Sequence, residues 1–232
     1  KAGLPVAWHH VVVGQSILVG TPFEKFAVHD GVDGSSIEGI ADSPYLEGTK
    51  AKHVSLHSPK TGIPVLWWRS VGNTHTAFAM ECAIDELAHA AGKDPLAYRL
   101  ALLQGKPRFA RALETAATRA GWGTPAPAGR ARGLAVHESF GTIVAEVAEV
   151  SVEGGRIRVH AVTAAVDCGT AVNPLGIEAQ IQEIGRMAAD GDVVPSAVGT
   201  DRQIDVSTDS RLDMNEDAFG NIISGVFIVS FK

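Results

Sequence analysis

The order of elements along this chain predicts an α+β fold, in which central helices pack on mixed β-structure. Three observations support this class. Residues 6–13 are rich in β-branched and aromatic side chains, which is typical of a strand. Between residues 76 and 120, apolar side chains recur at helical spacing in three successive segments. Further along, the spacing changes to two, and a Gly-Gly pair at 154–155 separates two alternating segments, as in a β-hairpin.

The N-terminal part is predicted to consist of strands and a loop. The strand at 6–13 is followed by residues 20–49, which are rich in Gly, Asp, Ser and Pro. Because this segment has little periodicity, we expect a long surface loop. Two further strands are expected near residues 51–57 and 63–68.

The first helix is expected over residues 76–91. Thr74 or Asn73 can cap its start with a side-chain oxygen, and Gly92 is typical of a residue that ends a helix. The residues expected on its buried face are Met80, Ile84, Leu87 and Ala91.

Two shorter helices follow. Asp94 and Pro95 are typical of an N-cap and of the first helical position, and Gly105 ends the predicted helix. A third helix is expected over residues 108–120 and stops at Gly121. Their apolar faces carry Leu96, Leu100, Leu103, Phe109, Leu113 and Ala116.

The chain is expected to fall into four stretches. Residues 1–122 hold the strands, the loop and the three helices, and residues 123–132 form a linker dense in Pro and Gly. Residues 133–182 hold the β-hairpin and the segment after it. Residues 183–232 form an atypical acidic tail with nine acidic and four basic residues, which accounts for −5 of the net charge of −6. This tail ends in a strand-like stretch at 222–231.

Composition excludes several classes of protein. A net charge of −6, without a basic stripe, argues against nucleic acid as the main partner. Two cysteines, Cys82 and Cys168, cannot supply the four thiolates of an iron–sulfur cluster, and we predict that both are buried free thiols. No apolar run approaches the roughly 20 residues that span a bilayer. Residues 1–5 carry neither an initiator Met nor a signal-peptide pattern, so we expect part of a longer protein, and no compartment is indicated.

Several catalytic motifs are missing from the sequence. There is no Gly-x-Ser-x-Gly elbow, no Gly-x-Gly-x-x-Gly and no phosphate-binding loop. His137-Glu138 begins like a zinc-protease motif, but the second His is not in place. The nine histidines are scattered without the sequence spacing of metal ligands, so no metal-binding residue is predicted.

A calcium-like pattern occurs in the tail. Asp213, Asn215 and Asp217 match the first three ligand positions of a calcium-binding loop. Ala218 then replaces the required Gly, and Ser224 replaces the bidentate Glu. We therefore interpret this stretch as a solvated acidic loop.

Two turns could contact a ligand. Residues 67–73 join a strand to the start of the first helix, where free N–H groups favour an anionic or carbonyl-bearing ligand and Arg69 can add charged hydrogen bonds. The alternative is an ordinary strand–helix turn with a surface Arg. Residues 167–174 lead from an apolar strand through a Gly turn into an Asn-Pro break, followed by Gln180.

Three segments together resemble a known family. These are residues 65–75 with 83–88, residues 133–141, and residues 167–182. In this order and spacing they are similar to the molybdopterin-binding large subunit of the isoquinoline 1-oxidoreductase-like aldehyde and N-heterocycle dehydrogenases. This group belongs to the xanthine dehydrogenase superfamily of molybdenum hydroxylases. The resemblance covers about residues 3–182.

The resemblance implies a molybdopterin cofactor, oxidation of an aldehyde or an N-heterocycle, and a small partner subunit that carries the iron–sulfur clusters. Val71 matches a position that faces the substrate, where xanthine-type relatives carry an aromatic residue. An aliphatic residue there implies a different or less flat substrate. The positions that match cofactor contacts are Trp68, Arg69, Ser70, Gly72, Asn173 and Gln180.

The sequence departs from the family after Gln182. Glu183-Ile184 replaces a Gly-Gly pair, and the Gly-Glu-Pro motif that carries the family's base is not found. Because Glu138 and Glu183 lie outside the matching context, no catalytic residue is assigned. We expect a partial oxidoreductase subunit that is inactive alone. The alternative is a non-catalytic folded module whose acidic tail binds a partner or a cation.

Overall fold

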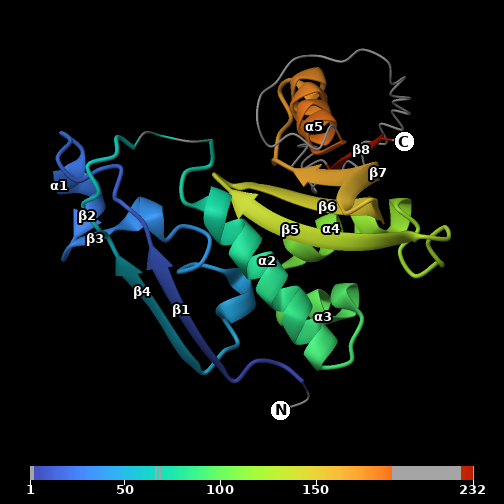
Figure 1. Ribbon diagram of the computed structural model, residues 1–232, viewed down its shortest axis with the longest axis horizontal. Coiled ribbons are helices and arrows are strands. Elements are labelled where there is room, and N and C mark those ends of the chain that lie inside the picture. Colours follow the sequence, from blue (N-terminus) through green and yellow to red (C-terminus); the bar gives the residue numbers. More distant parts are fainter. Residues whose placement is uncertain (1–2, 66, 68, 190–225, 232) are drawn as a thin grey trace, which may run out of the picture. The chain divides into compact units, whose positions relative to one another are not determined.

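The computed structural model describes residues 3–65, 67, 69–189 and 226–231, and the chain forms two compact units (Figure 1). The first unit comprises the chain up to Lys106 together with Glu138–Phe140. The second comprises Pro107–His137 and the chain from Gly141 onward. Three successive helices, α2 to α4, are followed by three successive strands, β5 to β7, so the predicted α+β class is confirmed.

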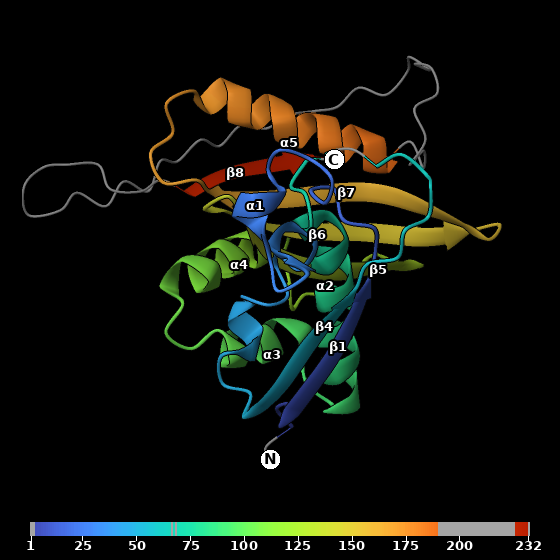
Figure 2. The ribbon, with the colours of Figure 1, turned by 90° about the vertical axis from the view of Figure 1, so that its left-hand side faces the viewer.

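A pair of parallel strands lies in the first unit. β1 (Ala7–Val13) and β4 (Ala51–His57) run side by side, as Figure 2 shows, and both were predicted. The strand expected at 63–68 is wrong for the residues that are described, because Ile63–Val65 and Trp67 belong to no strand. The side chain of Gln15 fixes this segment instead, since its Nε2 donates to the Ile63 carbonyl at 3.1 Å.

Residues 20–49 are not the surface loop that the composition predicts. Ile40 is fully buried. The buried carboxylate of Asp33 accepts hydrogen bonds from the hydroxyl of Ser16, at 2.5 Å, and from the hydroxyl of Ser35, at 2.6 Å. Such side-chain hydrogen bonds order a polar segment without a periodic pattern. The segment contains α1 (Glu24–Ala27), β2 (Val28–His29), β3 (Val32–Asp33) and the 3-10 helices η1 (Gly34–Ser36) and η2 (Pro44–Leu46).

The first predicted helix is α2 (Asn73–Ala90), which begins three residues earlier than expected. Its N-cap is Gly72 and no side chain caps it, so the predicted cap at Thr74 or Asn73 is wrong. Its end is as predicted: Gly92 has a φ of 62°, and the next N–H closes the last turn onto the Ala88 carbonyl. The core residues of α2 include Met80, Ile84 and Ala88.

The two cysteines were both expected to be buried. Cys82 on α2 is exposed, and Cys168 is half-buried. Both are free thiols. The prediction is therefore wrong for Cys82, which lies on the outer side of α2, where the apolar spacing does not apply.

Helix α3 (Pro95–Leu102) forms as the Asp-Pro signal predicts, since the Asp94 carboxylate accepts the Ala97 N–H at 2.9 Å. It also carries Arg99, whose side chain is completely buried. The Arg99 guanidinium contacts Glu81 at 2.8 Å and Asp85 at 2.6 Å. Burial lowers the pKa of Arg99, but these two carboxylates raise it by more, so the group stays charged.

The second unit contains a four-stranded sheet in the order β5 (Arg130–Ser139), β6 (Thr142–Glu153), β7 (Arg156–Asp167) and β8 (Val226–Phe231). The predicted hairpin is β6–β7: Gly154 and Gly155 have φ values of 57° and 76°, as a two-residue turn requires. β5 begins inside the segment expected to be a linker. β8 lies within the predicted strand-like end and pairs with β7, antiparallel.

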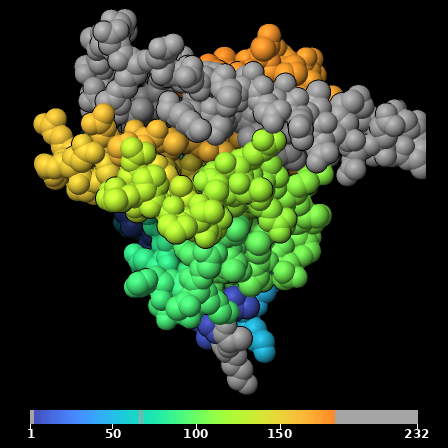
Figure 3. Space-filling model, turned by 90° about the vertical axis from the view of Figure 1, so that its right-hand side faces the viewer, coloured from blue at the N-terminus to red at the C-terminus, as the bar shows by residue number. Residues whose placement is uncertain are grey.

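Two helices cover opposite faces of this sheet (Figures 1 and 2). α4 (Pro107–Arg119) was predicted, and it buries Phe109, Leu113 and Ala116 against one face. Its outer side lies at the surface, in green in Figure 3. α5 (Pro174–Ala189) was not predicted; its Ile181 packs with alternate residues of β7 on the other face. α5 runs through position 182, where the family resemblance ends.

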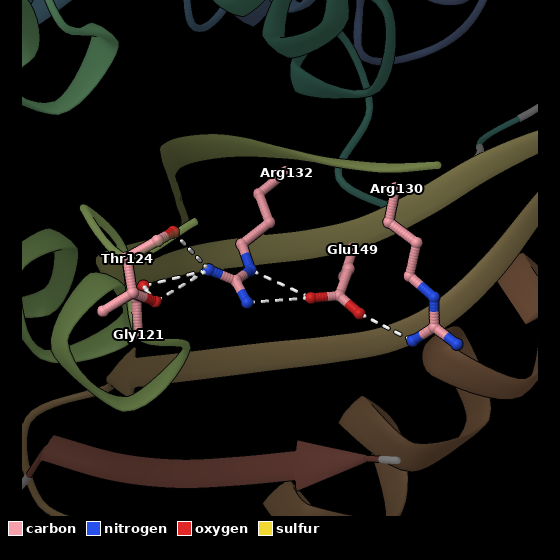
Figure 4. Close-up of polar contacts among 5 residues, drawn as sticks. All are labelled: Gly121, Thr124, Arg130, Arg132 and Glu149. Carbon is pink, nitrogen blue, oxygen red and sulfur yellow. Dashed lines mark hydrogen bonds and ion pairs between the residues drawn. The ribbon is translucent and has the colours of Figure 1, made fainter. Parts of the chain in front are cut away.

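An ion network fixes the turn after α4 to the sheet (Figure 4). Arg132 contacts Glu149 at 2.9 Å and donates a hydrogen bond to the Gly121 carbonyl at 2.9 Å. Arg130 donates to the other oxygen of the same carboxylate at 2.8 Å. Hydrogen bonds from these two arginines lower the pKa of Glu149. The network thereby joins the turn after α4 to β5 and β6.

Predictions for the tail between α5 and β8 lie outside the described residues, including the calcium-like pattern at 213–224. Among the helices that the structure describes, none combines the length and apolar character needed to cross a membrane.

The buried Arg99 provides a test of this fold. Arg99→Met leaves the carboxylate of Glu81 buried without its charge partner, so we expect the free energy of unfolding to fall by about 3–5 kcal/mol. Urea denaturation followed by circular dichroism measures this loss. The matched control is Lys106→Met, which breaks the exposed Lys106–Glu47 pair and should cost less than about 1 kcal/mol. Equal losses for the two variants would contradict a structural role for the buried network.

Candidate functional site

The turn before α2 is strained. Ser70 and Val71 have φ values of 64° and 49°, a conformation that is uncommon for any residue except Gly and especially for a β-branched one. Gly72, which follows, is buried, and a Cβ there would come within 2.0 Å of the Ser35 carbonyl oxygen. Arg69 is exposed. Backbone strain of this kind persists only where the surroundings hold it, and it clusters at ligand sites.

A carboxylate that the sequence did not point to occupies the start of α2. The Gly72 N–H donates to Glu38, and the Asn73 side-chain amide donates to its Oε2 at 3.3 Å. The Thr76 hydroxyl donates to the Glu38 backbone carbonyl at 2.6 Å. Burial raises the pKa of Glu38, and the charges of nearby aspartates raise it further. The helix N-terminus predicted to attract an anionic ligand therefore already faces an internal acid.

Asp167 organises the other predicted turn. Its side chain is completely buried at the end of β7, and Arg108 of α4 contacts it at 2.9 Å while Arg111 lies at 3.5 Å. The carboxylate also accepts the Gly169 N–H at 3.2 Å, which bends the chain away from the strand. Burial raises the pKa of Asp167, but the hydrogen bonds from Arg108 and Gly169 outweigh this effect and hold the pKa below its usual value.

Asn173 and Gln180 both lie at α5. The Asn173 side-chain oxygen accepts the Gly176 N–H at 3.1 Å, so this residue caps the helix. Pro174 occupies the first helical position. Gln180 lies exposed on the second turn of this helix, where the sequence indicated only a break followed by a polar residue. The sequence contained the signal for α5, because an Asn-Pro pair is typical of a helix start.

The predicted site residues fall into two groups. Arg69, Ser70, Val71 and Gly72 adjoin one another in the first unit, whereas Asn173 and Gln180 lie at the cap and on the second turn of one helix of the second unit. Trp68 lies outside the described residues. Sequence reasoning missed Glu38 as part of the first turn, and it placed Asp167 in the second turn without assigning it the ion pair with Arg108. No local signal identifies Glu38, because it lies in a segment without periodicity, far from α2 in the sequence.

Comparison with known proteins relates these turns to a family. Residues 71–183 match the family of molybdopterin cofactor-binding domains. The chain is 32% identical, over 185 residues, to the beta subunit of isoquinoline 1-oxidoreductase from Brevundimonas diminuta, covering 76% of this chain and 23% of that protein. It is 37% identical, over 134 residues, to a nicotinate dehydrogenase subunit from Pseudomonas putida, covering 50% of this chain and 11% of that protein.

A third relative carries the name membrane-bound aldehyde dehydrogenase [pyrroloquinoline-quinone], from Gluconacetobacter polyoxogenes. It is 35% identical over 137 residues, which are 50% of this chain and 18% of that protein. The chain thus spans less than a quarter of the length of each of these relatives. No solved structure matches it.

The close packing at Gly72 can be tested by adding one methyl group. Gly72→Ala would place a Cβ against the Ser35 carbonyl, so we expect the free energy of unfolding to fall by at least about 1–3 kcal/mol. Gly48→Ala is the matched control, because the added Cβ meets nothing within 4 Å. Thermal unfolding compares the two. Equal stability of both variants would show that the turn is not held by this contact.

The ion pair of Asp167 predicts a pH dependence. The pKa of Asp167 is lower in the folded state than in the unfolded chain, where it is about 3.9. The carboxylate therefore stabilises the fold fully at pH values above about 3.9, and this contribution is lost as the pH falls through the folded-state pKa. Asp167→Asn should therefore destabilise the protein by about 1–3 kcal/mol at pH 7, because Arg108 and Arg111 are partly exposed, with a smaller difference from wild type below pH ~4. Urea denaturation at several pH values measures this difference.

The control is Glu114→Gln, a substitution at an exposed position of α4, which should change the free energy of unfolding by no more than about 0.5 kcal/mol. A constant difference across the pH range would argue against this role for Asp167.

Proposed function

We propose that this chain, which carries a partial match to the molybdopterin-binding domain of the xanthine dehydrogenase family, supplies part of the cofactor-binding site of a molybdenum-dependent oxidoreductase. The observation that carries the proposal is the extent of the match at residues 71–183. It contains the end of the strained turn before α2 and the whole of the turn that leads into α5. Each turn leads to an exposed polar side chain, Arg69 at the first and Gln180 beyond the second.

The exposed side chains fit the chemistry of the cofactor. Molybdopterin presents a phosphate and a ring edge with N–H and carbonyl groups. The Arg69 guanidinium suits the phosphate, and the Gln180 amide can both donate to the ring and accept from it. Ser70 adds a hydroxyl beside Arg69. We assign direct contacts to these three residues, with Trp68 as a fourth by resemblance.

Two of the predicted contact residues, Asn173 and Gly72, fix the backbone conformation of their turns. The Asn173 side chain caps α5 and thereby orients Gln180. The Gly72 N–H is bonded to Glu38, and its Cα packs against Ser35, so Gly72 positions the turn. We propose that these two residues hold the contact residues in place and do not themselves bind the cofactor.

The names of the relatives and the aliphatic Val71 support an aldehyde or an N-heterocycle as the proposed substrate class. Two relatives are named for isoquinoline and nicotinate, which are N-heterocycles, and the third for an aldehyde. The bound molybdenum centre would supply the oxidation chemistry, and Val71 would line the substrate with an aliphatic surface. Because this chain has only two cysteines, we assign the iron–sulfur clusters that remove the electrons to a small partner subunit.

We further propose that the chain does not turn over substrate alone. It spans 23% of the isoquinoline-oxidising relative, and no described residue is assigned as a catalytic base. Cofactor binding can therefore be tested without turnover, by measuring how much molybdenum and pterin the purified chain contains.

Cofactor content should depend on Gln180. Loss of a hydrogen bond worth about 1.5 kcal/mol lowers affinity roughly ten-fold, so Gln180→Ala should reduce bound molybdenum and pterin severalfold. Elemental analysis and pterin fluorescence of the purified chain, expressed with molybdate, measure both. Gln182→Ala is the matched control, because the Gln182 side chain on the same helix donates a hydrogen bond to Glu178 within α5.

An artificial-acceptor assay with an aldehyde and isoquinoline measures whether the chain oxidises either substrate. A folded wild-type chain that carries neither molybdenum nor pterin would overturn the proposal.

A further inference from the structure

The parallel pair β1–β4 presents an exposed face that carries histidines. Because the two strands pair in register, residues at the same level point to the same side. His9 lies opposite His53, with Ala7 opposite Ala51 on one side of the pair and Val11 opposite Ser55 on the other. Both imidazoles are exposed. The two strands lie side by side in Figure 2.

The distance between the two ring centroids matches that of two imidazoles whose nitrogens bind one tetrahedral metal ion. Their centroids are 5.2 Å apart and their planes are inclined by 48°, so they are not stacked. A zinc–nitrogen bond is about 2.0–2.1 Å and the nitrogen lies about 1.1 Å from the ring centre, so two imidazoles at the tetrahedral angle have centroids about 5.2 Å apart. A right-angled, square-planar pair would have centroids about 4.5 Å apart by the same arithmetic.

The surroundings leave the pair accessible. The neighbours on one side are alanines, whose methyl groups are too short to cover the rings, and both rings face solvent. In the part of the chain that the structure describes, no group of three or more His, Cys, Asp or Glu side chains could hold a metal. The remaining coordination positions would therefore be filled by water, as in a site that exchanges its metal.

We propose that His9 and His53 form a surface site for a tetrahedral divalent metal ion such as Zn²⁺, bound by two imidazoles and water. The site lies in the first unit and is independent of the proposed molybdenum cofactor. Sequence spacing cannot point to it, because its two ligands come from strands that are separated by the whole 20–49 segment. The two histidines lie beside each other because β1 and β4 pair in this parallel register.

Zinc titration of the full chain tests the site. Isothermal calorimetry with Zn²⁺ should give one equivalent at the pair, and His9→Gln or His53→Gln should each weaken binding at least ten-fold. Because both imidazoles hold one ion, the double variant should lose little more than either single variant. Circular dichroism checks the fold, which substitution at exposed positions should leave intact.

Two controls make the result specific. His57→Gln removes an exposed histidine of the same face, and His29→Gln removes one from β2; neither should change zinc affinity. If the losses from the two single variants simply add in the double variant, each histidine binds separately and the proposal fails. It also fails if the wild-type chain binds no zinc, or if His57→Gln weakens binding as much as His53→Gln does.

Discussion

The second unit depends on the buried carboxylate of Asp167. One guanidinium, that of Arg108, bonds this carboxylate, the Asp167 carbonyl and the Gly141 carbonyl, so a single side chain joins α4 to the β5–β6 turn and to the end of β7. The same carboxylate receives the Gly169 N–H and sets the direction of the chain into α5. An unpaired charge at this position would cost several kcal/mol, so rearrangement of the turn is strongly disfavoured.

Elements with local signals were predictable, and elements held by distant contacts were not. The Gly154-Gly155 hairpin and the Asp94-Pro95 helix start are decided by residues next to each other in the chain. The order in residues 20–49 is different, because it depends on Asp33 meeting Ser16 across many residues. α5 was missed for another reason: its Asn-Pro cap was interpreted as a break, although the same pair begins helices.

The turn before α2 was predictable, but its electrostatics were not. The helical pattern placed the start of a helix close to residue 73, and the turn with Arg69 precedes that start. Glu38, however, takes the N–H group of Gly72, so the positive end of the α2 dipole is partly compensated within the protein. A phosphate would consequently be attracted mainly by the exposed Arg69 guanidinium and less by the helix N-terminus. Under the proposed function, the affinity of this turn for a phosphate would depend on the balance between the exposed Arg69 guanidinium and the half-buried Glu38 carboxylate.

The pairing of β8 with β7 has an evolutionary consequence. Asp167 lies opposite Val226 and Val162 opposite Phe231, so the last strand covers the backbone edge of the strand that carries the Asp167 turn. The hydrogen bonds that join two strands come from backbone groups, which every residue except proline can provide in full. A segment of unrelated ancestry can therefore complete this sheet, provided that it is extended and free of proline. Replacement of the C-terminal sequence during gene rearrangement would then preserve the architecture around the turn while erasing the recognisable lineage of the strand beside it.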